Sequence, residues 1–198
     1  MIRRVLERGG VVLVPTESSY GVAVDPRSAA GVETVYRLKE RDRGKPLGVV
    51  VADIAQALTL GVDAEDPALR WARRHWPAPL SVLVRVSERL PAMGGADRLS
   101  IRIPAHPELR RLLGALGPLT ATSANRAGEP PIVEPDEASH WAAGVDHVVV
   151  DGGVLAGGEP STVVSWEVPP GGVGRPRVLR SGRFLCPAVG PSLPAPTP

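Results

Sequence analysis

The chain has 198 residues, of which 43% are hydrophobic and 4% aromatic, and its formal net charge at pH 7 is +2. This composition predicts a globular protein with an aliphatic core, and so small a charge gives little support to a broad nucleic-acid-binding surface. No apolar run approaches the roughly 20 residues of a membrane-spanning helix, and the N-terminus lacks a secretory pattern. The one cysteine, Cys186, excludes an internal disulfide and a cysteine-built metal cage. We therefore expect a cytoplasmic protein.

In the first half of the chain, buried-strand patterns alternate with amphipathic helices. Ser28 and Asp66 are the predicted N-caps of two helices, and Pro67 occupies the first position of the second. The predicted elements are a helix over 2–8, a strand over 11–15, a polar loop, a helix over 28–40, a strand over 46–53, helices over 54–60 and 66–76, and a strand over 80–86.

The second half continues with strands and helices and ends in a proline-rich segment. The predicted elements are a strand over 99–104, a helix over 106–116, a strand over 118–123, a helix over 134–143, and strands over 147–151, 161–168 and 177–181. Strands interleaved in this irregular order predict one α/β domain with a mixed parallel and antiparallel sheet. We place this domain at 1–185 and expect a disordered tail over 186–198, because that segment is rich in proline.

Three polar loops adjoin the apolar strands, which is where α/β folds commonly bind ligands. They read PTESSYG (15–21), KERDRGK (39–45) and TATSANRAGEP (120–130). Each sequence also suits simple turn chemistry, because Thr, Ser, Asn and Glu side chains satisfy loop backbone groups. For the first loop, a capped turn and a site for a small polar molecule are equally open. In the third, Ser123 and Asn125 could donate to a phosphate, a carboxylate or a base edge without adding charge.

The loop KERDRGK contains both lysines of the chain, Lys39 and Lys45. Its cations could interact with the exposed carbonyls at the end of the preceding helix, or form a solvated charge run. They could equally bind a polyphosphate, because a lysine ammonium is a compact charge that reaches a phosphoryl oxygen from many angles. Gly44-Lys45 is followed by Pro46 and lacks the upstream glycine of a phosphate-binding P-loop. The four histidines are far apart in sequence, so they do not predict a metal site.

Seven motifs in order make the chain similar to one known family. They are PTESSYG, Lys39-Glu40-Arg41, WPAPLSVLV (76–84), SIRIPAHP (100–107), Ser123-Ala124-Asn125, STVV (161–164) and VLRSGRF (178–184). This pattern resembles the YrdC-type domain of the threonylcarbamoyl-adenylate synthase family, in its short bacterial form without an additional C-terminal domain. The resemblance covers nearly the whole chain up to the tail.

The resemblance implies a twisted mixed α/β sheet with a large, positively lined cavity. It also implies that L-threonine, bicarbonate and ATP react, with Mg²⁺, to give threonylcarbamoyl-AMP and pyrophosphate. Transferase proteins would then receive the product and modify adenosine 37 of tRNA. Weak RNA binding is a further possibility under this resemblance, and binding to a membrane is not expected.

The resemblance also assigns roles to individual side chains. The implied catalytic residues are Lys39, Arg41, Ser123 and Asn125, which would bind ATP together with Lys45 and Arg180. The implied residues for threonine or bicarbonate are Thr16, Arg102, Thr122 and Ser161. No resident metal ligand is expected.

The chain departs from the family at several positions, which leaves alternatives open. Ser18-Ser19 stands where many members have threonine-valine, Glu40 and Asp42 add acids around the Lys-x-Arg pair, and Val50 replaces a histidine of archaeal members. The alternatives are a non-synthase paralogue with the same fold, an RNA-binding module, and a carbamoyl-transfer domain of a larger enzyme. The retained Lys39, Arg41, Ser123 and Asn125 favour the synthase.

Overall fold

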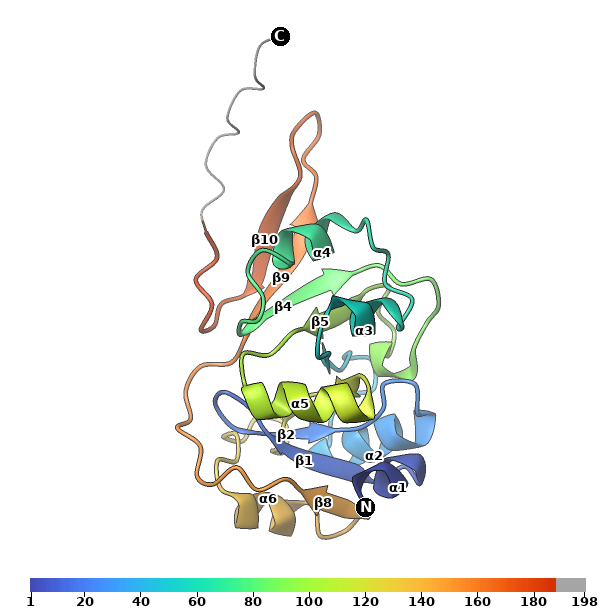
Figure 1. The fold of residues 1–198 in the computed structure, drawn as a ribbon, viewed down its shortest axis with the longest axis vertical. Coiled ribbons are helices and arrows are strands. Elements are labelled where there is room, and N and C mark those ends of the chain that lie inside the picture. Colours follow the sequence, from blue (N-terminus) through green and yellow to red (C-terminus); the bar gives the residue numbers. More distant parts are fainter. Residues whose placement is uncertain (188–198) are drawn as a thin grey trace.

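Ten strands pair into two sheets in the computed structural model, which describes residues 1–187 (Figure 1). The smaller sheet has the order β7-β2-β1-β8, and the larger has the order β10-β9-β4-β5-β3-β6. The strands are β1 (Val11–Pro15), β2 (Tyr20–Ala23), β3 (Val49–Val50), β4 (Leu80–Val84), β5 (Leu99–Arg102), β6 (Leu119–Thr120), β7 (Thr122–Ser123), β8 (His147–Val149), β9 (Thr162–Glu167) and β10 (Arg175–Arg180).

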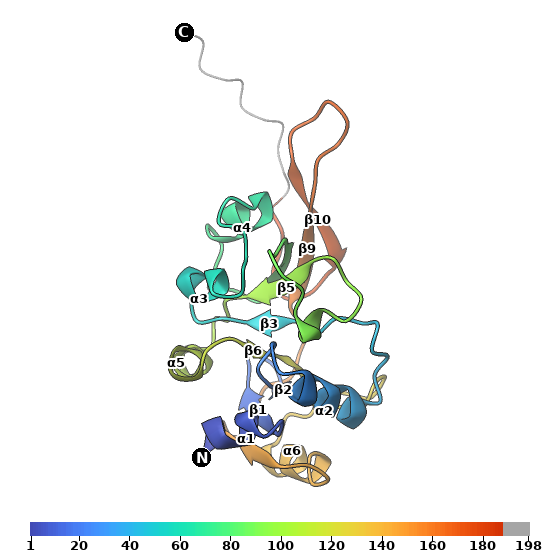
Figure 2. The same cartoon turned by 90° about the vertical axis from the view of Figure 1, so that its right-hand side faces the viewer.

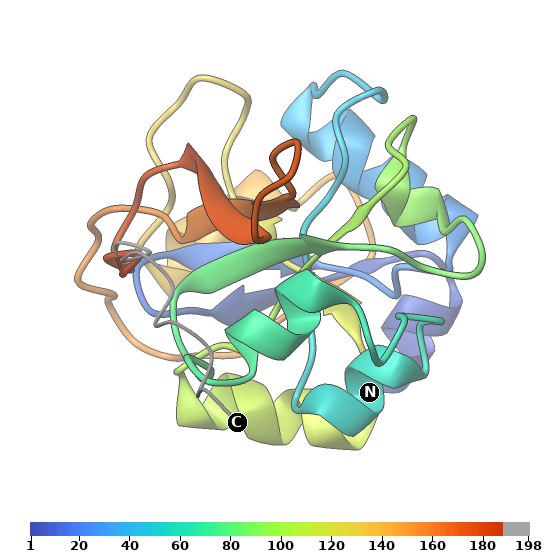
Figure 3. The ribbon, with the colours of Figure 1, turned by 90° about the horizontal axis from the view of Figure 1, so that it is seen from above.

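The helices pack around these sheets, with α3, α4 and α5 along one side of the larger sheet (Figures 2 and 3). Figure 1 shows α1, α2 and α6 gathered at the end of the molecule that holds the smaller sheet. The helices are α1 (Ile2–Glu7), α2 (Ala29–Lys39), α3 (Ile54–Leu58), α4 (Pro67–Ala72), α5 (Pro107–Leu116) and α6 (Pro135–Trp141), with a short 3-10 helix, η1, over Pro91–Met93.

Both sheets contain parallel and antiparallel pairs, which confirms the predicted mixed α/β fold. In the smaller sheet β1 pairs antiparallel with β2 and parallel with β8. In the larger sheet β4 pairs antiparallel with β5 and parallel with β9. The predicted strand over 118–123 divides at Ala121, because β6 pairs with β3 of the larger sheet and β7 pairs with β2 of the smaller one. This segment therefore connects the two sheets.

Strand β1 is buried along its whole length, which explains its uninterrupted apolar sequence. Val11 and Leu13 belong to the larger core cluster, whereas Val12 and Val14 belong to a second cluster that includes residues of α5. Successive side chains of a strand point to opposite faces, so β1 packs against a core on each side.

Several predicted boundaries are wrong. The polar loop expected before α2 contains β2, whose four residues are all buried. Helix α4 ends at Ala72 rather than at residue 76, and β3 covers only Val49–Val50 of the strand predicted over 46–53. Most of the predicted tail lies outside the described residues, because these end at residue 187. Cys186, where that tail was expected to begin, still packs against the core.

Candidate functional site

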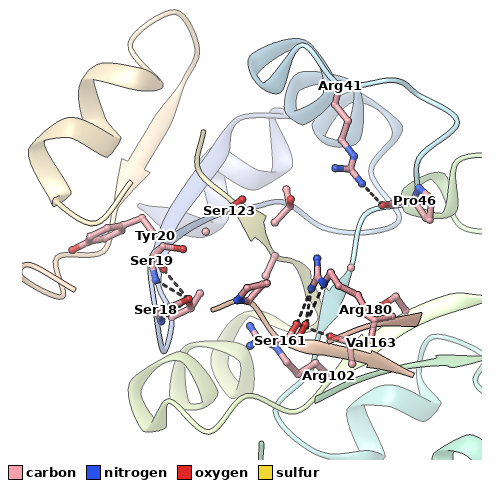
Figure 4. Close-up of a pocket in the computed structure, with 18 of the residues that line it drawn as sticks. Ser18, Ser19, Tyr20, Arg41, Pro46, Arg102, Ser123, Ser161, Val163 and Arg180 are labelled. Atoms are coloured by element: carbon pink, nitrogen blue, oxygen red, sulfur yellow. Dashed lines mark hydrogen bonds between the residues drawn. The ribbon is translucent and has the colours of Figure 1, made fainter. Parts of the chain in front are cut away.

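A pocket of about 410 Å³ is lined by segments of both sheets (Figure 4). The β1–β2 loop and β7 contribute from the smaller sheet, while β4, β5, β9 and β10 contribute from the larger one. The loop between α2 and β3 closes another side. The lining residues are Thr16, Ser18, Ser19, Tyr20, Gly21, Arg41, Pro46, Gly48, Ser81, Leu83, Ser100, Arg102, Ala121, Thr122, Ser123, Pro160, Ser161, Val163 and Arg180.

Three arginines give this pocket a positive charge, and no Asp or Glu is among the described residues that line it. Arg41 comes from the loop after α2, Arg102 from the end of β5, and Arg180 from the end of β10. Burial lowers the pKa of Arg180, and the neighbouring cations Arg102 and Arg41 lower it further. Like charges held this close favour the binding of an anion, because the anion relieves their mutual repulsion.

Arg102 is held by Glu17, which the sequence did not single out. Their side chains are only 12% and 14% exposed, and Arg102 Nη1 donates to Glu17 Oε2 at 3.0 Å. The other carboxylate oxygen accepts the N–H of Ala105 at 2.8 Å. Burial alone would raise the pKa of Glu17, but Arg102 and the backbone N–H donors bring it below its usual value. The carboxylate therefore ties the β1–β2 loop to the segment after β5.

Arg41 and Arg180 face the pocket, and neither has a carboxylate partner in the part of the chain that the structure describes. Arg180 donates to the carbonyl of Ser161 at 2.8 Å, and Ser161 Oγ lies 3.2 Å from Ser81 Oγ. Arg41 Nη2 donates to the carbonyl of Pro46 at 3.1 Å. Its Nε is buried and has no hydrogen-bond partner among the described residues. A buried donor without a partner is costly. The part of the guanidinium that a ligand can reach is the part on the pocket wall.

The structure brings seven of the predicted site residues to the pocket wall: Thr16, Arg41, Arg102, Thr122, Ser123, Ser161 and Arg180. Lys39, Lys45 and Asn125 are not among the lining residues. Lys39 is only 3% exposed, and its ammonium donates to the carbonyls of Ser123 and Asn125 and to Asn125 Oδ1. Burial, followed by the neighbouring Arg41, lowers the pKa of Lys39 to about 8. Lys45 is exposed on the loop between α2 and β3.

The acids of KERDRGK have local structural partners. Glu40 is the C-cap of α2 in a left-handed conformation, with φ of 49°, and its carboxylate lies 3.3 Å from Arg126 Nε. Asp42 Oδ1 accepts the N–H of Gly44 at 2.9 Å, which braces the following turn. Neither acid lines the pocket. They therefore shape the loop that carries Arg41.

The β1–β2 loop combines the two roles that its sequence left open. Thr16 Oγ1 donates to the carbonyl of Ser19 at 2.7 Å and accepts from the N–H of Ser18, so it braces a turn. The same three residues line the pocket. Ser81 and Ser100 also line the pocket. Sequence reasoning gave them no role, although both lie in the motifs WPAPLSVLV and SIRIPAHP and each is a polar residue within an apolar strand.

Comparison with known proteins identifies the family. The family model Sua5/YciO/YrdC, described as "Telomere recombination", matches residues 4–182. The chain belongs to this family. It is 38% identical over 163 residues to the threonylcarbamoyl-AMP synthase of Thiobacillus denitrificans, covering 80% of this chain and 86% of that protein.

Solved structures of family members are similar over most of the chain. Sua5 of P. abyssi, in a crystal structure with L-threonine, has a TM-score of 0.78 at 28% identity. That match covers 91% of this chain and 52% of the other, so this chain spans about half the length of the archaeal protein. YciO of E. coli has a TM-score of 0.75 at 22% identity, covering 91% and 86% of the two chains, which shows a common fold.

The described residues contain no group of three or more His, Cys, Asp or Glu side chains able to hold a metal ion. Within the same part of the chain, every helix is too short or too polar to cross a bilayer.

Proposed function

We propose that this chain is an L-threonylcarbamoyladenylate synthase, which joins L-threonine, bicarbonate and ATP and releases pyrophosphate. The observation that carries the proposal is the pocket itself, in which Arg41, Arg102 and Arg180 converge among hydroxyl groups, with no Asp or Glu among the described residues of its lining. The similarity of the chain to threonylcarbamoyl-AMP synthases supports this choice of reaction. The three substrates present phosphates and carboxylates, and arginine recognises both.

We assign the pocket residues to two groups, one for the triphosphate of ATP and one for a substrate carboxylate. Arg41 and Arg180 would hold the triphosphate, because both line the pocket and neither is paired with an acid among residues 1–187, unlike Arg102. Arg102 would hold a substrate carboxylate with Thr16, Thr122 and Ser161 around it. Lys45, exposed on the loop of Arg41, remains our candidate for an outer phosphate. Mg²⁺ would arrive with ATP and keep water and phosphate oxygens as ligands, in line with its preferences.

The chemistry needs charge neutralisation more than a nucleophilic side chain. The threonine amine and bicarbonate condense to a carbamate with loss of water. A carbamate oxygen then attacks the α-phosphorus of ATP, and the bond from that phosphorus to the bridging oxygen breaks, so that pyrophosphate leaves with its electrons. Two anions must therefore approach each other. Fixed cations lower the barrier by positioning both and by stabilising the charge that builds up during transfer. This makes the protein a nucleotidyltransferase.

We further propose that residues 1–185 form the catalytic domain and that the reaction takes place in the cytoplasm. The product would pass to proteins that transfer the threonylcarbamoyl group to tRNA.

The test is pyrophosphate release by the purified protein with ATP, bicarbonate and L-threonine. We expect release that depends on threonine. Arg180→Met should lower it at least tenfold, because a fixed cation of the phosphate site is lost. Arg177→Met is the matched control, since Arg177 lies on the same strand, is exposed, and does not line the pocket. It should behave like the unmodified protein.

Two results would contradict the proposal. Pyrophosphate release that does not depend on threonine would favour a non-synthase paralogue of the same fold. No release at all, combined with salt-dependent binding of RNA, would favour an RNA-binding module.

A further inference from the structure

The hydrogen bonds of Lys39, Asn125 and Ser123 leave one possible direction for each proton. Lys39 is the last residue of α2, and its ammonium donates three hydrogen bonds, to the carbonyls of Ser123 and Asn125 and to Asn125 Oδ1. An ammonium group has three protons and accepts nothing. All of its donors are therefore used within the chain.

The orientation of the Asn125 carboxamide follows from its partners. One end meets Lys39, which can only donate, at 2.9 Å, and the other end meets the carbonyl of Glu129, which can only accept, at 2.6 Å. Oxygen must therefore face Lys39 and nitrogen must face Glu129. Amide orientations are often assigned from optimised networks, but here the two partners permit only one.

This orientation fixes the Ser123 hydroxyl in turn. Ser123 Oγ lies 2.6 Å from Asn125 Oδ1, and a carboxamide oxygen cannot donate. The single proton of the hydroxyl is therefore committed to Asn125. What Ser123 turns toward the pocket is its lone pairs, and it lines that pocket while Lys39 and Asn125 do not.

We propose that Ser123 is a specificity-determining hydrogen-bond acceptor, which receives an N–H or O–H group of the substrate rather than donating to a phosphate. Lys39 and Asn125 are positioning residues, which impose this polarity from behind the pocket wall. The family resemblance, by contrast, implies that all three side chains bind ATP and its phosphates. The amine and hydroxyl of threonine and the ribose hydroxyls and amino group of ATP are donors of the required kind, whereas pyrophosphate at neutral pH offers mainly acceptors.

The first test observes the proton directly and needs no ligand. In a neutron structure of the deuterated protein, the deuteron of Ser123 should lie between Oγ and Asn125 Oδ1. A deuteron directed into the pocket would overturn the proposal. This result does not depend on whether the chain is a synthase.

The second test rests on the proposed function and compares ligands by calorimetry, using ATP, L-threonine and pyrophosphate separately. Ser123→Ala should weaken ATP or threonine about five- to tenfold, the effect of one lost hydrogen bond, and leave pyrophosphate unchanged. Weaker pyrophosphate binding, or no change for any ligand, would contradict the inference. If the unmodified protein binds neither ATP nor threonine, the proposed function fails, and the neutron structure still decides the polarity of Ser123.

Two substitutions at Asn125 separate positioning from general structural support. Asn125→Asp keeps an acceptor for both Lys39 and Ser123 and loses only the donor to the Glu129 carbonyl, whereas Asn125→Leu loses that donor and the acceptor as well, which frees the hydroxyl proton. The readout is a ratio of two affinities: that for the ligand which Ser123→Ala binds more weakly, divided by that for pyrophosphate. A merely looser fold would lower both affinities and leave their ratio unchanged. We expect the ratio to be kept in Asn125→Asp and to fall in Asn125→Leu. Equal ratios in the two variants would show that the network does not set the polarity.

Discussion

The ion pair between Glu17 and Arg102 gives a sharp prediction for stability and its dependence on pH. The two side chains are 14% and 12% exposed, and the pair is separated by 3.0 Å. At about 4 Å and an effective dielectric constant near 20 two unit charges attract by about 4 kcal/mol, from which the cost of removing both from water must be subtracted. Glu17→Gln keeps an acceptor for the N–H of Ala105 and loses the charge. We expect it to lower the free energy of unfolding by about 2 kcal/mol at pH 7.

The sign of the pH dependence follows from the pKa of Glu17, which lies below its usual value in the folded protein. The contribution of Glu17 is fully present above the pKa of the unfolded chain and is lost as pH falls through the folded pKa. Urea unfolding from pH 7 down to pH 3 should therefore find the unmodified protein and Glu17→Gln converging in stability as the pH falls. Glu33→Gln is the control, because its pair with Arg43 is exposed and should change little.

Two results would refute this reasoning. One is a Glu17→Gln variant as stable as the unmodified protein at pH 7, and the other is a difference that stays constant from pH 7 to pH 3. A double-mutant cycle with Arg102→Met should give a coupling of about 1–3 kcal/mol. A coupling near zero would mean that Glu17 acts on the loop without Arg102.

Two further pairs of variants test how the scaffold is held. Asp66 is 1% exposed, and its carboxylate accepts three backbone N–H groups, whereas Asp53 is an exposed cap with one such bond. Asp66→Ala should therefore lower the free energy of unfolding by about 3 kcal/mol and Asp53→Ala by about 1 kcal/mol. Equal losses in urea unfolding would contradict this. A Cβ on Gly182 would lie 2.1 Å from the carbonyl oxygen of Pro160, beside the pocket, whereas one on Gly144 would meet nothing within 4 Å. Gly182→Ala should therefore lower both the melting temperature and the affinity for pyrophosphate, while Gly144→Ala changes neither. If Gly182→Ala binds pyrophosphate normally, this segment does not shape the pocket.

Local sequence predicted the class of the fold, because the signals concerned are short-range. The run VVLV gave a strand buried on both faces, and Ser28 caps α2 by accepting the N–H of Gly31 at 3.1 Å, as its position predicted. The division into two sheets was not predicted, because it depends on which distant strands pair with the residues on either side of Ala121.

The sequence, through its family motifs, also predicted many of the residues that line the pocket. Arg41, Arg102, Ser123, Ser161 and Arg180 were all expected at a site for phosphates and carboxylates, and the structure gathers them on its wall. Glu17 belongs to the first polar loop, but its ion pair was not predicted because the partner, Arg102, is 85 positions away in the chain. A pattern of neighbours carries no information about such a contact.

The lysines of KERDRGK show what the sequence alone determines and what depends on tertiary contacts. The sequence determined that a cluster of cations follows α2 and precedes a buried strand. Only the tertiary structure decided that Lys39 turns away from the pocket toward the Ser123–Asn125 segment, while Arg41 faces the pocket. The physical reason is that a helix end sets where a side chain begins, but the oxygens that it meets are supplied by a loop from another part of the chain. These tertiary partners decide whether a charged side chain is free to bind a ligand or instead supports the pocket wall.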